Sequence, residues 1–404
     1  MKYLFSPIIG LLFIFLLFLP QIHAQSTSLM DVNSWAYQLQ NININQVVSD
    51  TSFELIVMDY SQDGTDDFKF TSQQITQIKN SGEKAIAYIS IGEAEDYRYY
   101  WQSSWETTPP SWLGDENPDW HGNYKVRFWN TAWQNIIFSY IDTIISQGFD
   151  GIYMDIIDAY YYWQFENSEE PMADSLMVQF VLNIRNHIDG LTLDTFYIIP
   201  QNGEFVTEEG NVSASFKAVF FNTINGIGVE DVFFEGNFDE DNPYNPDNDR
   251  ILLLQEYLSN GKQVFSIEYL TQSSKIQQYL NEAATQQFVP YVCVRDLDQL
   301  CSGIATRVEG NLIMQKSGFS IYPNPASLFA AITFEQPLQK DLYVNVYSIL
   351  GKPVKEIGSN FKKRSTPNSF LLNLSDLQDG IYLLEIFRST PDIKIRRLLI
   401  KKEE

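Results

Sequence analysis

Short apolar runs alternate with amphipathic segments of helical period between residues 30 and 305. The clearest helix is predicted over 130–148, where Asn130 or Thr131 can cap the start and Gly148 can end it. A second helix of the same kind is predicted over 249–261, with Gly261 at its end. The apolar stripe of the first helix consists of Trp133, Ile136, Ile137, Tyr140, Ile141, Ile144 and Ile145.

The apolar runs between the helical segments predict eight parallel strands. Eight strand–helix units in about 270 residues are typical of a closed (β/α)8 TIM barrel. An open doubly wound sheet is the competing α/β fold, but no GxGxxG or phosphate-loop glycine pattern follows any strand, so the barrel is favoured. The candidate strands are WAYQLQ from 35, FELIVMDY from 53, KAIAYISIG from 84, GIYMDII from 151, TFYIIPQNG from 195, GIGVEDVFF from 226, QVFSIEY from 263 and FVPYVCVRD from 288.

Polar side chains stand at the end of each predicted strand. In a barrel these ends meet on one face, where active sites are built. Asp155, inside an apolar run, can therefore project into a polar funnel instead of being an isolated buried charge. The alternative is that Asp155 only pairs with Arg295 to hold the barrel closed. The strand-end residues are Gln38 and Gln40; Asp59 and Tyr60; Ser90, Glu93 and Glu95; Asp155 and Asp158; Gln201 and Asn202; Glu230 and Asp231; Glu268 and Tyr269; Arg295 and Asp296.

The composition favours an exported protein with a sizeable core. The chain has 404 residues, of which 44% are hydrophobic and 15% aromatic. Residues 1–24 read as a secretory signal peptide, cut after Ala24, and no transmembrane anchor is expected in the mature form. We expect the barrel to occupy 25–305, a linker 306–318, and a small all-β sandwich 319–404.

The charge is distributed unevenly over these regions. Of the 27 Lys and Arg and 51 Asp and Glu residues, 12 and 9 lie from Phe319 onward, which leaves 15 basic and 42 acidic residues before it. Such an acidic body is expected to repel nucleic acid and to attract cationic ligands. Acidity that merely keeps an exported protein soluble is an equally simple explanation.

The C-terminal segment alternates apolar and polar residues between Gly and Pro turns, which predicts a small antiparallel sandwich. Its motifs resemble the C-terminal sorting domain of the type IX secretion system found in Bacteroidetes. The resemblance implies export to the cell surface or the medium of a Bacteroidetes-type bacterium through the type IX machinery, usually with removal of the tag. The alternative is a carbohydrate-binding module, but few exposed aromatic positions support it. The matching motifs are IYPNPA (321–326), VYSILGKPV (346–354), LSDLQDGIYLLEI (374–386) and RRLLIKK (396–402).

The residue types available for catalysis point to carboxylates. Only His121 and His187 lie outside the signal peptide, so a zinc site or a Ser-His-Asp triad is not favoured. Cys293 and Cys301 can pair in an oxidising compartment, but their spacing leaves that question open. Several carboxylates in one cleft fit acetal hydrolysis, which needs one protonated and one ionised carboxyl. Aromatic clusters at 97–105 and 160–163 flank the same strands and offer faces on which sugar rings stack.

Over residues 30–300 the chain is similar to glycoside hydrolase family 114, the endo-α-1,4-polygalactosaminidase-like barrels. The resemblance implies a (β/α)8 fold and hydrolysis of polysaccharide containing α-1,4-linked galactosamine. A partly deacetylated polymer of this kind is cationic, which agrees with the acidic body. The motifs that carry the resemblance are WAYQLQ, VMDYS, AYISIGEAEDYRYYW, FDGIYMDIIDAYYYW, IIPQNGE, GIGVEDVFFE, SIEYL and VPYVCVRDLD.

The family's catalytic carboxylates lie at the ends of the fourth and sixth strands, which here carry Asp155 and Glu230. Asp158 and Asp231 are the neighbouring alternatives, and Glu93 is the strongest rival as second carboxylate. No metal and no other cofactor is expected, because the acidic loops at 63–67 and 237–249 do not match a calcium loop. The residues expected to contact substrate are Asp59, Tyr60, Tyr88, Glu93, Glu95, Tyr153, Asp158, Tyr160, Gln201, Asn202, Glu268, Tyr269 and Arg295.

Two other functions remain open at this point. A non-catalytic glycan-binding barrel would keep an aromatic groove but would not need paired acids. A metal-dependent polysaccharide deacetylase would act on the same polymer, although the shortage of histidines counts against it.

Overall fold

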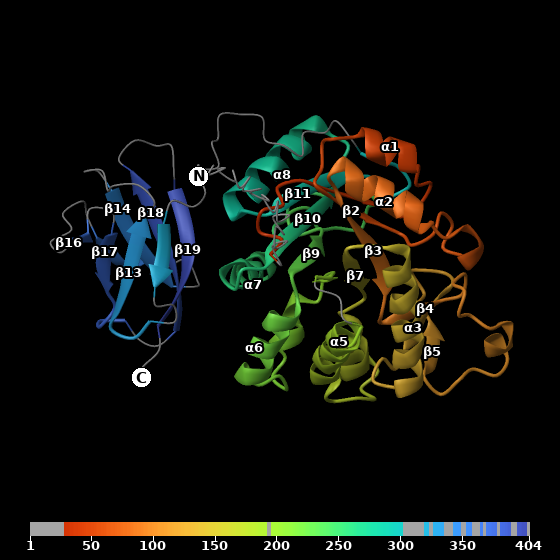
Figure 1. Cartoon of the computed structure of the whole chain (residues 1–404). Coiled ribbons are helices and arrows are strands. Elements are labelled where there is room, and N and C mark those ends of the chain that lie inside the picture. Colours follow the sequence, from red (N-terminus) through yellow and green to blue (C-terminus); the bar gives the residue numbers. More distant parts are fainter. Residues whose placement is uncertain are drawn as a thin grey trace, which may run out of the picture.

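The structure is a computed structural model, and it describes two parts of the chain (Figure 1). The predicted signal peptide at 1–24 and the predicted linker at 306–318 both lie outside the described residues. The N-terminal part covers 28–191 and 195–301, and the C-terminal part covers 319–322, 326–334, 342–348, 353–357, 364–366, 369–377, 380–388 and 394–401.

All eight candidate strands of the N-terminal part are present in the described residues, and every pairing between them is parallel. The prediction of an α/β fold is therefore confirmed. The strands are β1 (Trp35–Gln38), β2 (Leu55–Met58), β3 (Lys84–Ser90), β7 (Gly151–Asp155), β8 (Tyr197–Pro200), β9 (Gly226–Glu230), β10 (Gln263–Tyr269) and β11 (Val289–Cys293).

These strands form a five-stranded sheet in the order β1-β2-β3-β7-β8 and a three-stranded sheet in the order β11-β10-β9. The two sheets meet between β8 and β9, where a parallel bridge joins Gln201 to Gly228. Beside that bridge, the Asn225 N–H donates to the Ile198 carbonyl at 2.8 Å. At the other pair of edges, the Trp35 indole N–H donates to the Val289 carbonyl at 3.0 Å. Neighbouring strands therefore follow one another in chain order.

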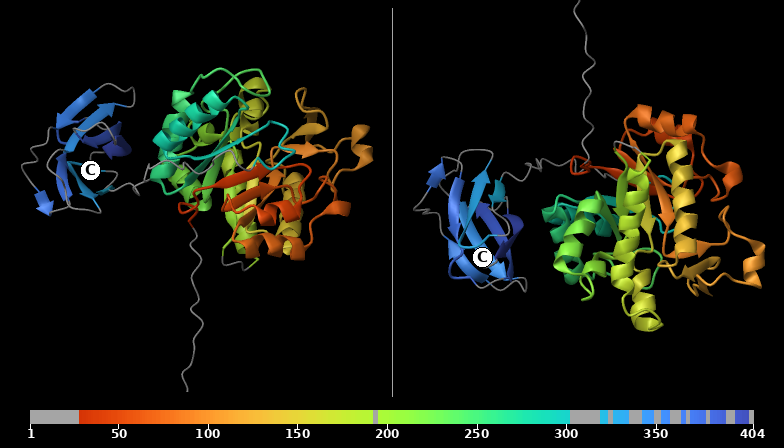
Figure 2. Two further views of the ribbon diagram at one scale, coloured as in Figure 1. Left: turned by 90° about the horizontal axis from the view of Figure 1, so that it is seen from above. Right: turned by 60° about the horizontal axis from the view of Figure 1, so that its bottom comes forward.

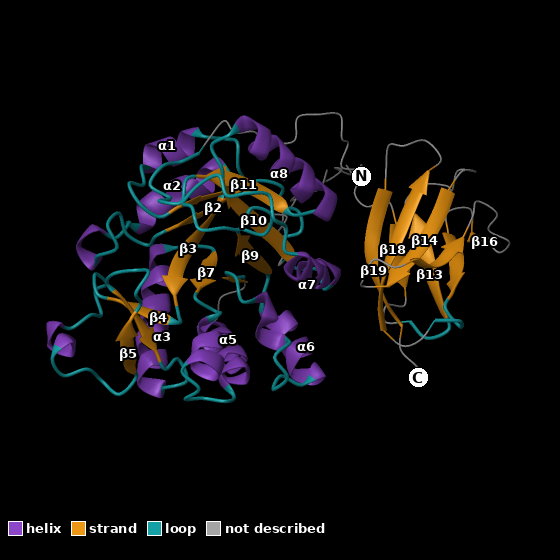
Figure 3. Ribbon diagram, turned by 180° about the vertical axis from the view of Figure 1, so that it is seen from behind, coloured by secondary structure: helices purple, strands orange, loops and turns teal. Residues whose placement is uncertain are grey.

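Helices lie around the outside of the strands (Figures 1 and 3). The strongest helix prediction is confirmed, because α3 is capped by the Asn130 side chain and ends before Gly148, whose φ is 90°. None of the helices in the described ranges is long and apolar enough to cross a membrane. The α-helices are α1 (Ile44–Ser49), α2 (Ser72–Ser81), α3 (Thr131–Gln147), α4 (Ala159–Tyr161), α5 (Ala173–Asp189), α6 (Ala214–Thr223), α7 (Asn248–Ser259) and α8 (Ser273–Gln286). Shorter helical turns are η1 (Asp66–Phe68), η2 (Ser103–Glu106), η3 (Tyr162–Glu166, a π-helix) and η4 (Glu204–Thr207).

The boundaries of α7 differ from the predicted 249–261. The Asp247 side chain accepts hydrogen bonds from the N–H groups of Asp249 and Arg250, so the helix begins at Asn248. At the other end Asn260 is the C-cap and bonds back to Glu256, so Gly261, with a φ of 72°, follows the cap. The cap at Asp247 thus places the start of the helix one residue earlier than predicted, and the backbone bonds of Asn260 end it before Gly261.

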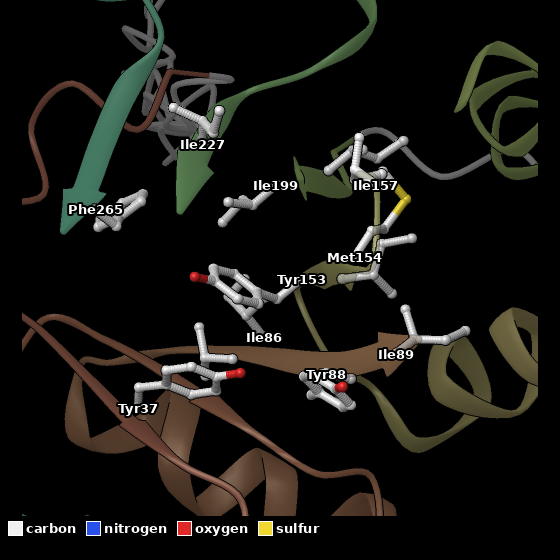
Figure 4. Packing of buried hydrophobic residues seen from close by; sticks show 14 of the residues in the cluster. Tyr37, Ile86, Tyr88, Ile89, Tyr153, Met154, Ile157, Ile199, Ile227 and Phe265 are labelled. Carbon is white, nitrogen blue, oxygen red and sulfur yellow. The ribbon is translucent and has the colours of Figure 1, made fainter. Parts of the chain in front are cut away.

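Side chains that alternate along the strands fill the interior with aromatic rings. Tyr37 lies 5.9 Å from Trp35 and 5.2 Å from Tyr153, centroid to centroid. Figure 4 shows the rings of Tyr37, Tyr88 and Tyr153 together between the strands. Gly228 makes room for Tyr153, because a Cβ on this glycine would lie 1.8 Å from the tyrosine oxygen. Figure 2 gives two further views, with the strands inside and the helices outside.

A small antiparallel sheet between β3 and α3 was not predicted. It consists of β4 (Glu93–Glu95), β5 (Leu113–Glu116) and β6 (Asn123–Val126), in the order β4-β6-β5. Glu93 and Glu95, expected as residues of a loop after the third strand, thus lie on a strand that pairs with β6.

The described residues of the C-terminal part form two antiparallel four-stranded sheets, in the orders β12-β13-β17-β16 and β15-β14-β18-β19. Both sheets contribute fully buried side chains, among them Ile332 and Leu372 from one and Val346 and Leu384 from the other. The strands are β12 (Phe319–Tyr322), β13 (Phe329–Phe334), β14 (Leu342–Ser348), β15 (Pro353–Ile357), β16 (Arg364–Thr366), β17 (Ser369–Asn373), β18 (Gly380–Arg388) and β19 (Lys394–Lys401).

Cys293 and Cys301 form a disulfide, with 5.4 Å between their Cα atoms. This pairing settles the question that the sequence left open. Within the loop that the disulfide closes, the Leu297 carbonyl accepts hydrogen bonds from the N–H groups of Leu39 and Gln40, which follow β1. The loop after the last strand of the N-terminal part is therefore attached to the end of the first.

Candidate active site

A cleft of about 890 Å³ lies over the C-terminal ends of β3, β7 and β9. Its lining combines many carboxyl groups with aromatic rings and two cations, Lys125 and Arg250. The acidic lining residues are Glu93, Asp119, Asp158, Glu166, Glu204, Glu209, Glu230, Asp231 and Glu235. The aromatic ones are Trp120, Tyr160, Tyr161, Tyr162, Trp163 and Phe205.

Asp155 is the last residue of β7 and faces the interior. It shares a strand face with Tyr153, whose ring packs against Tyr37. The Tyr88 hydroxyl donates to Asp155 Oδ2 at 2.7 Å, and the Ile156 N–H donates to Oδ1 at 2.8 Å. The alternation of side chains along β7 therefore accounts for the orientation of this carboxyl.

The backbone bends sharply directly after Asp155. Ile156 has a φ of 61°, an unfavourable value for a β-branched residue. Gly92 permits this conformation, because a Cβ there would lie 2.1 Å from the Ile156 carbonyl oxygen. Strained backbone of this kind is concentrated at functional sites, and here it directly follows the carboxyl of Asp155.

Glu230 is the last residue of β9 and lines the cleft. The Tyr269 hydroxyl donates to Glu230 Oε1 at 2.5 Å. Its backbone is held as well, since its N–H donates to Asn202 Oδ1 at 3.1 Å and its carbonyl accepts from Arg250 Nη1 at 2.9 Å. Asp155 and Glu230 thus each receive a hydrogen bond from one buried tyrosine.

The charge of Glu230 acts on the protonation of Asp155. Burial raises the pKa of Asp155 well above its usual value, and the nearby charge of Glu230 raises it further. Burial also raises the pKa of Glu230, opposed by the hydrogen bond from Tyr269. Asp155 therefore keeps its proton to a higher pH than an exposed carboxyl does, and a protonated carboxyl is what a general acid requires.

Arg295 does not pair with Asp155. Its Nη2 donates to both carboxylate oxygens of Asp231, at 2.9 and 3.1 Å, and its guanidinium lies 4.1 Å from the centre of the Tyr269 ring. The alternative that Asp155 serves only as a partner of Arg295 is therefore wrong. Asp231 follows Glu230 with a φ of 52°, and this turn directs its side chain toward Arg295.

Glu93 lines the cleft from β4, although its side chain is almost fully buried. Its Oε1 accepts from Asn117 Nδ2 at 2.8 Å and lies 3.9 Å from Lys125 Nζ. Burial raises the pKa of Glu93, while Asn117 and Lys125 oppose the rise. Glu93 therefore lies in a polar pair with Lys125, apart from the tyrosines that hold Asp155 and Glu230.

Asp158 and Tyr160 also line the cleft, from the loop and helix that follow β7. The Tyr160 hydroxyl donates to Glu209 Oε1 at 3.2 Å. Burial raises the pKa of Asp158, and Glu204 adds to the rise. Asn202, at the end of β8, lines the cleft as well and fixes the backbone of Glu230.

Asp59, Tyr60 and Glu95 lie around a buried arginine and are not among the residues that line the cleft. Arg98 donates to Asp59 Oδ2 at 2.7 Å and to Glu95 Oε2 at 2.7 Å, and its side chain is 1% exposed. Its guanidinium also lies 5.8 Å from the centre of the Tyr60 ring. Buried charges need such partners, so Arg98 links the end of β4 to the residue that follows β2.

The remaining predicted residues support the pair from the interior or lie apart from it. Gln201 accepts a hydrogen bond from the Tyr37 hydroxyl at 3.1 Å. Glu268 points away from the interior, because its neighbour Tyr269 points in toward Glu230. It is fully buried, accepts from the Phe233 N–H at 2.7 Å, and burial raises its pKa to about 8.

Arg250 and Trp120 lie at the site but were not singled out from the sequence. Arg250 is ion-paired with Glu204 and reaches the Glu230 carbonyl and Asn202 Oδ1 from α7, so it holds the floor of the cleft. Trp120 projects from the β5–β6 turn with 58% of its surface exposed. In the sequence, the signal that could have identified Trp120 is a tryptophan within a polar turn segment. The sequence gives no signal for Arg250, because the apolar pattern of the helix does not show that this arginine points toward the cleft.

Among the described residues, no group of three or more His, Cys, Asp and Glu side chains is arranged to hold a metal ion.

Comparison with known proteins gives matches over both parts of the chain. The model of the glycoside-hydrolase family GH114 matches residues 19–311, and that of a secretion system C-terminal sorting domain matches residues 320–401. An uncharacterized protein of Methanocaldococcus jannaschii is 41% identical over 275 residues, which are 66% of this chain and 77% of that protein. An uncharacterized protein of Thermotoga maritima is 35% identical over 279 residues, 67% of this chain and 83% of that protein.

Among solved structures, the glycoside hydrolase domain of PelA from Pseudomonas aeruginosa resembles this fold with a TM-score of 0.50. The two share 14% sequence identity, and the match covers 66% of this chain and 97% of that domain. At this level of identity the likeness concerns the fold alone.

Proposed function

Because the chain belongs to glycoside hydrolase family GH114, we propose that it hydrolyses polysaccharide containing α-1,4-linked galactosamine, with Asp155 and Glu230 as its catalytic carboxyls. The observation that carries this proposal is the electrostatic coupling of these two groups beside an acidic, aromatic cleft. Hydrolysis of a glycosidic bond requires one carboxyl that donates a proton to the leaving oxygen. It also requires one carboxylate that attacks the anomeric carbon or deprotonates a water.

The environment of the pair supports this division of labour. Each carboxyl accepts a hydrogen bond from a buried tyrosine, and the charge of Glu230 disfavours ionisation of Asp155. Asp155 therefore stays protonated at a pH at which a solvent-exposed carboxyl has ionised. Tyr88 and Tyr269 each hold one carboxyl in position by a hydrogen bond. Because burial raises the pKa of both hydroxyls, neither tyrosine acts as a base itself.

The lining supports a cationic sugar polymer as the substrate. Exposed carboxylates attract ammonium groups, and the exposed rings of Trp120 and Tyr161 offer flat faces to sugar rings. None of the ion pairs in the described ranges involves Asp158, Glu209 or Glu235, so their charges are available to a ligand.

For the architecture we propose one closed (β/α)8 barrel made of the two parallel sheets. The order of the strands follows the chain, and hydrogen bonds cross between β8 and β9. The loop after β11 is bonded to the residues after β1, which supports closure at the second seam.

The sorting domain supports secretion or localisation at the cell surface. We propose that residues 1–24 are a signal peptide and that the catalytic body occupies 25–305. Residues 306–318 would then connect the body to a sandwich at 319–404 that addresses it to the type IX machinery of a Bacteroidetes-type bacterium.

A direct test incubates the exported protein with galactosamine-rich exopolysaccharide, with and without a chelator. We expect shorter oligosaccharides in both samples. Binding without shortening would support a glycan-binding barrel, and release of acetate that stops with chelator would support a deacetylase. Either of those results contradicts the proposal.

The carboxyl assignment is tested with Asp155→Asn and Glu230→Gln. Each substitution is expected to lower kcat by about 100- to 10,000-fold, the usual contribution of an acid or base. Glu268→Gln is the control, because burial also raises the pKa of this carboxyl but it lies on the other face of β10, and the variant should keep most of the activity. If Asp155→Asn and Glu230→Gln leave chain shortening unchanged, the pair is misassigned.

A further inference from the structure

One wall of the acidic cleft carries a cation in an unusual position. Lys125 lies on β6 directly opposite Glu93 of β4, and its Nζ is 3.9 Å from Glu93 Oε1. The same Nζ lies 4.4 Å from the centre of the Tyr162 ring, over its face. An ammonium over the face of a tyrosine beside a carboxylate is the arrangement in which proteins recognise a ligand ammonium. Here the protein's own side chain occupies it.

The second cation in the lining is not comparable. Arg250 is ion-paired with Glu204 and donates to the Glu230 carbonyl and to Asn202, so its guanidinium is committed to the floor of the cleft. Lys125 has one ion-pair partner, Glu93, at the limit of an ion pair, and its charge also acts on Asp158, while its side chain remains 22% exposed. Its positive charge therefore acts on any ligand bound against the wall of the cleft formed by Glu93 and Tyr162.

A sugar unit placed against this wall meets different forces depending on its amino group. A free ammonium would be repelled by Lys125 and would find the face of Tyr162 already covered. An N-acetylated unit carries no charge, and its amide can accept a hydrogen bond from the lysine ammonium. Elsewhere in the lining, Glu209 and Glu235 make no ion pair among the described residues, which favours ammonium groups there.

We propose that Lys125 is a specificity-determining residue, which selects an N-acetylated sugar unit at the wall formed by Glu93 and Tyr162 while the rest of the cleft takes deacetylated units. This inference rests on the proposed function and concerns the pattern of acetylation around the cleaved bond. Partly acetylated galactosamine polymer is then cleaved at those bonds whose neighbouring units have the matching pattern of acetylation.

The first test digests partly acetylated galactosamine polymer and sequences the products by mass spectrometry. Wild type should show an excess of acetylated units at one fixed position relative to the new chain ends. Lys125→Met, which keeps the length of the side chain but removes the charge, should lose that excess and cleave fully deacetylated polymer on the order of tenfold faster. Lys125→Arg keeps the charge and should keep the excess.

Lys69→Met is the matched control for net charge, because Lys69 is exposed and pairs with Asp66 away from the cleft. It should leave both the acetylation pattern and the rate unchanged. An identical pattern for wild type and Lys125→Met, or the same shift in Lys69→Met, overturns the inference while leaving the proposed hydrolase intact.

Binding gives a readout that does not depend on cleavage. In the Asp155→Asn background, Lys125→Met should bind a fully deacetylated galactosamine oligomer on the order of tenfold more tightly, and a fully acetylated one no more tightly. Equal effects on both oligomers overturn the inference. Absence of any cleavage by wild type refutes the proposed function, and the affinities still decide the role of Lys125.

Discussion

At the scale of single residues, three buried tyrosines around the carboxyl pair differ in what their hydroxyls do. Tyr88 donates to Asp155 and Tyr269 donates to Glu230, whereas the Tyr153 hydroxyl has no hydrogen-bond partner among the described residues. A hydrogen bond to a carboxylate favours its charged form and lowers its pKa. Tyr88 and Tyr269 therefore oppose the rise in pKa that burial causes, and Tyr153 fills space between them.

The substitution Tyr269→Phe removes the donor to Glu230. The pKa of Glu230, already raised by burial, should then rise further, because its charged form loses a hydrogen bond. The limb of the pH profile of kcat/KM that reports Glu230 should move to higher pH by about 1 unit.

Tyr153→Phe is the control for this experiment, since it removes a hydroxyl of equal burial that makes no hydrogen bond. It should leave both limbs of the profile in place. A Tyr269→Phe profile that is unshifted, or shifted to lower pH, contradicts the role given to this hydroxyl.

The sequence predicts the orientation of the two carboxyls but not all of their surroundings. Asp155 and Glu230 both end a strand on the interior face, and alternation with Tyr153 and Gly228 places them there. Alternation also explains why Glu268 is on the other face. Arg98 was missed because it lies in an irregular segment, and no period relates it to Asp59, its partner 39 residues away.

At the scale of elements, the positions of strands β7 and β9 depend on one close approach. Gly228 on β9 faces Tyr153 on β7, and the tyrosine oxygen occupies the place of a glycine side chain. Asp155 and Glu230 are the next inward residues along the same two strands. The distance between the strands therefore also sets the distance between the carboxyls.

Gly228→Ala should force the two strands apart, because its Cβ would lie 1.8 Å from the Tyr153 oxygen and 2.3 Å from a ring carbon. We expect the free energy of unfolding to fall by about 1–3 kcal/mol, together with a loss of activity. Thermal or denaturant unfolding and kcat measure the two effects.

Gly190→Ala serves as the comparison, since Gly190 has a φ of −64° and its nearest contact would be 3.3 Å away. Its stability should change by less than about 1 kcal/mol. If both alanine variants lose the same free energy of unfolding, the contact between Gly228 and Tyr153 does not set the distance between β7 and β9.

Elements with a clear period were predictable and those without one were not. The eight parallel strands are continuous apolar runs, because both faces of each are covered. In contrast, β4, β5 and β6 contain charged or polar residues at most positions, and their pairing depends on contacts such as Glu93 with Asn117. A local pattern does not encode such contacts.

At the scale of the whole molecule, the net charge of −24 acts on any ligand that approaches the cleft. The acidic residues are concentrated before residue 319, and nine of them line the cleft against two cations. This field should draw cationic polymer toward the site.

Affinity for cationic galactosamine oligomer should therefore fall as salt rises, since the Debye length shortens from about 30 Å at 0.01 M to about 8 Å at 0.15 M. Binding of the Asp155→Asn variant, measured by calorimetry across this range, checks the effect. A fully acetylated oligomer is the control and should show little change. Affinity for the cationic oligomer that is indifferent to salt contradicts the electrostatic part of the proposal.

The disulfide between Cys293 and Cys301 has a consequence for the life of the protein after export. Its ring contains the Leu297 carbonyl that binds the residues following β1, and it closes before the segment that leads to the tail. A protease that cuts beyond Cys301 therefore leaves the disulfide loop intact. If the C-terminal sorting domain is removed, β1 and β11 of the N-terminal part remain linked by these hydrogen bonds.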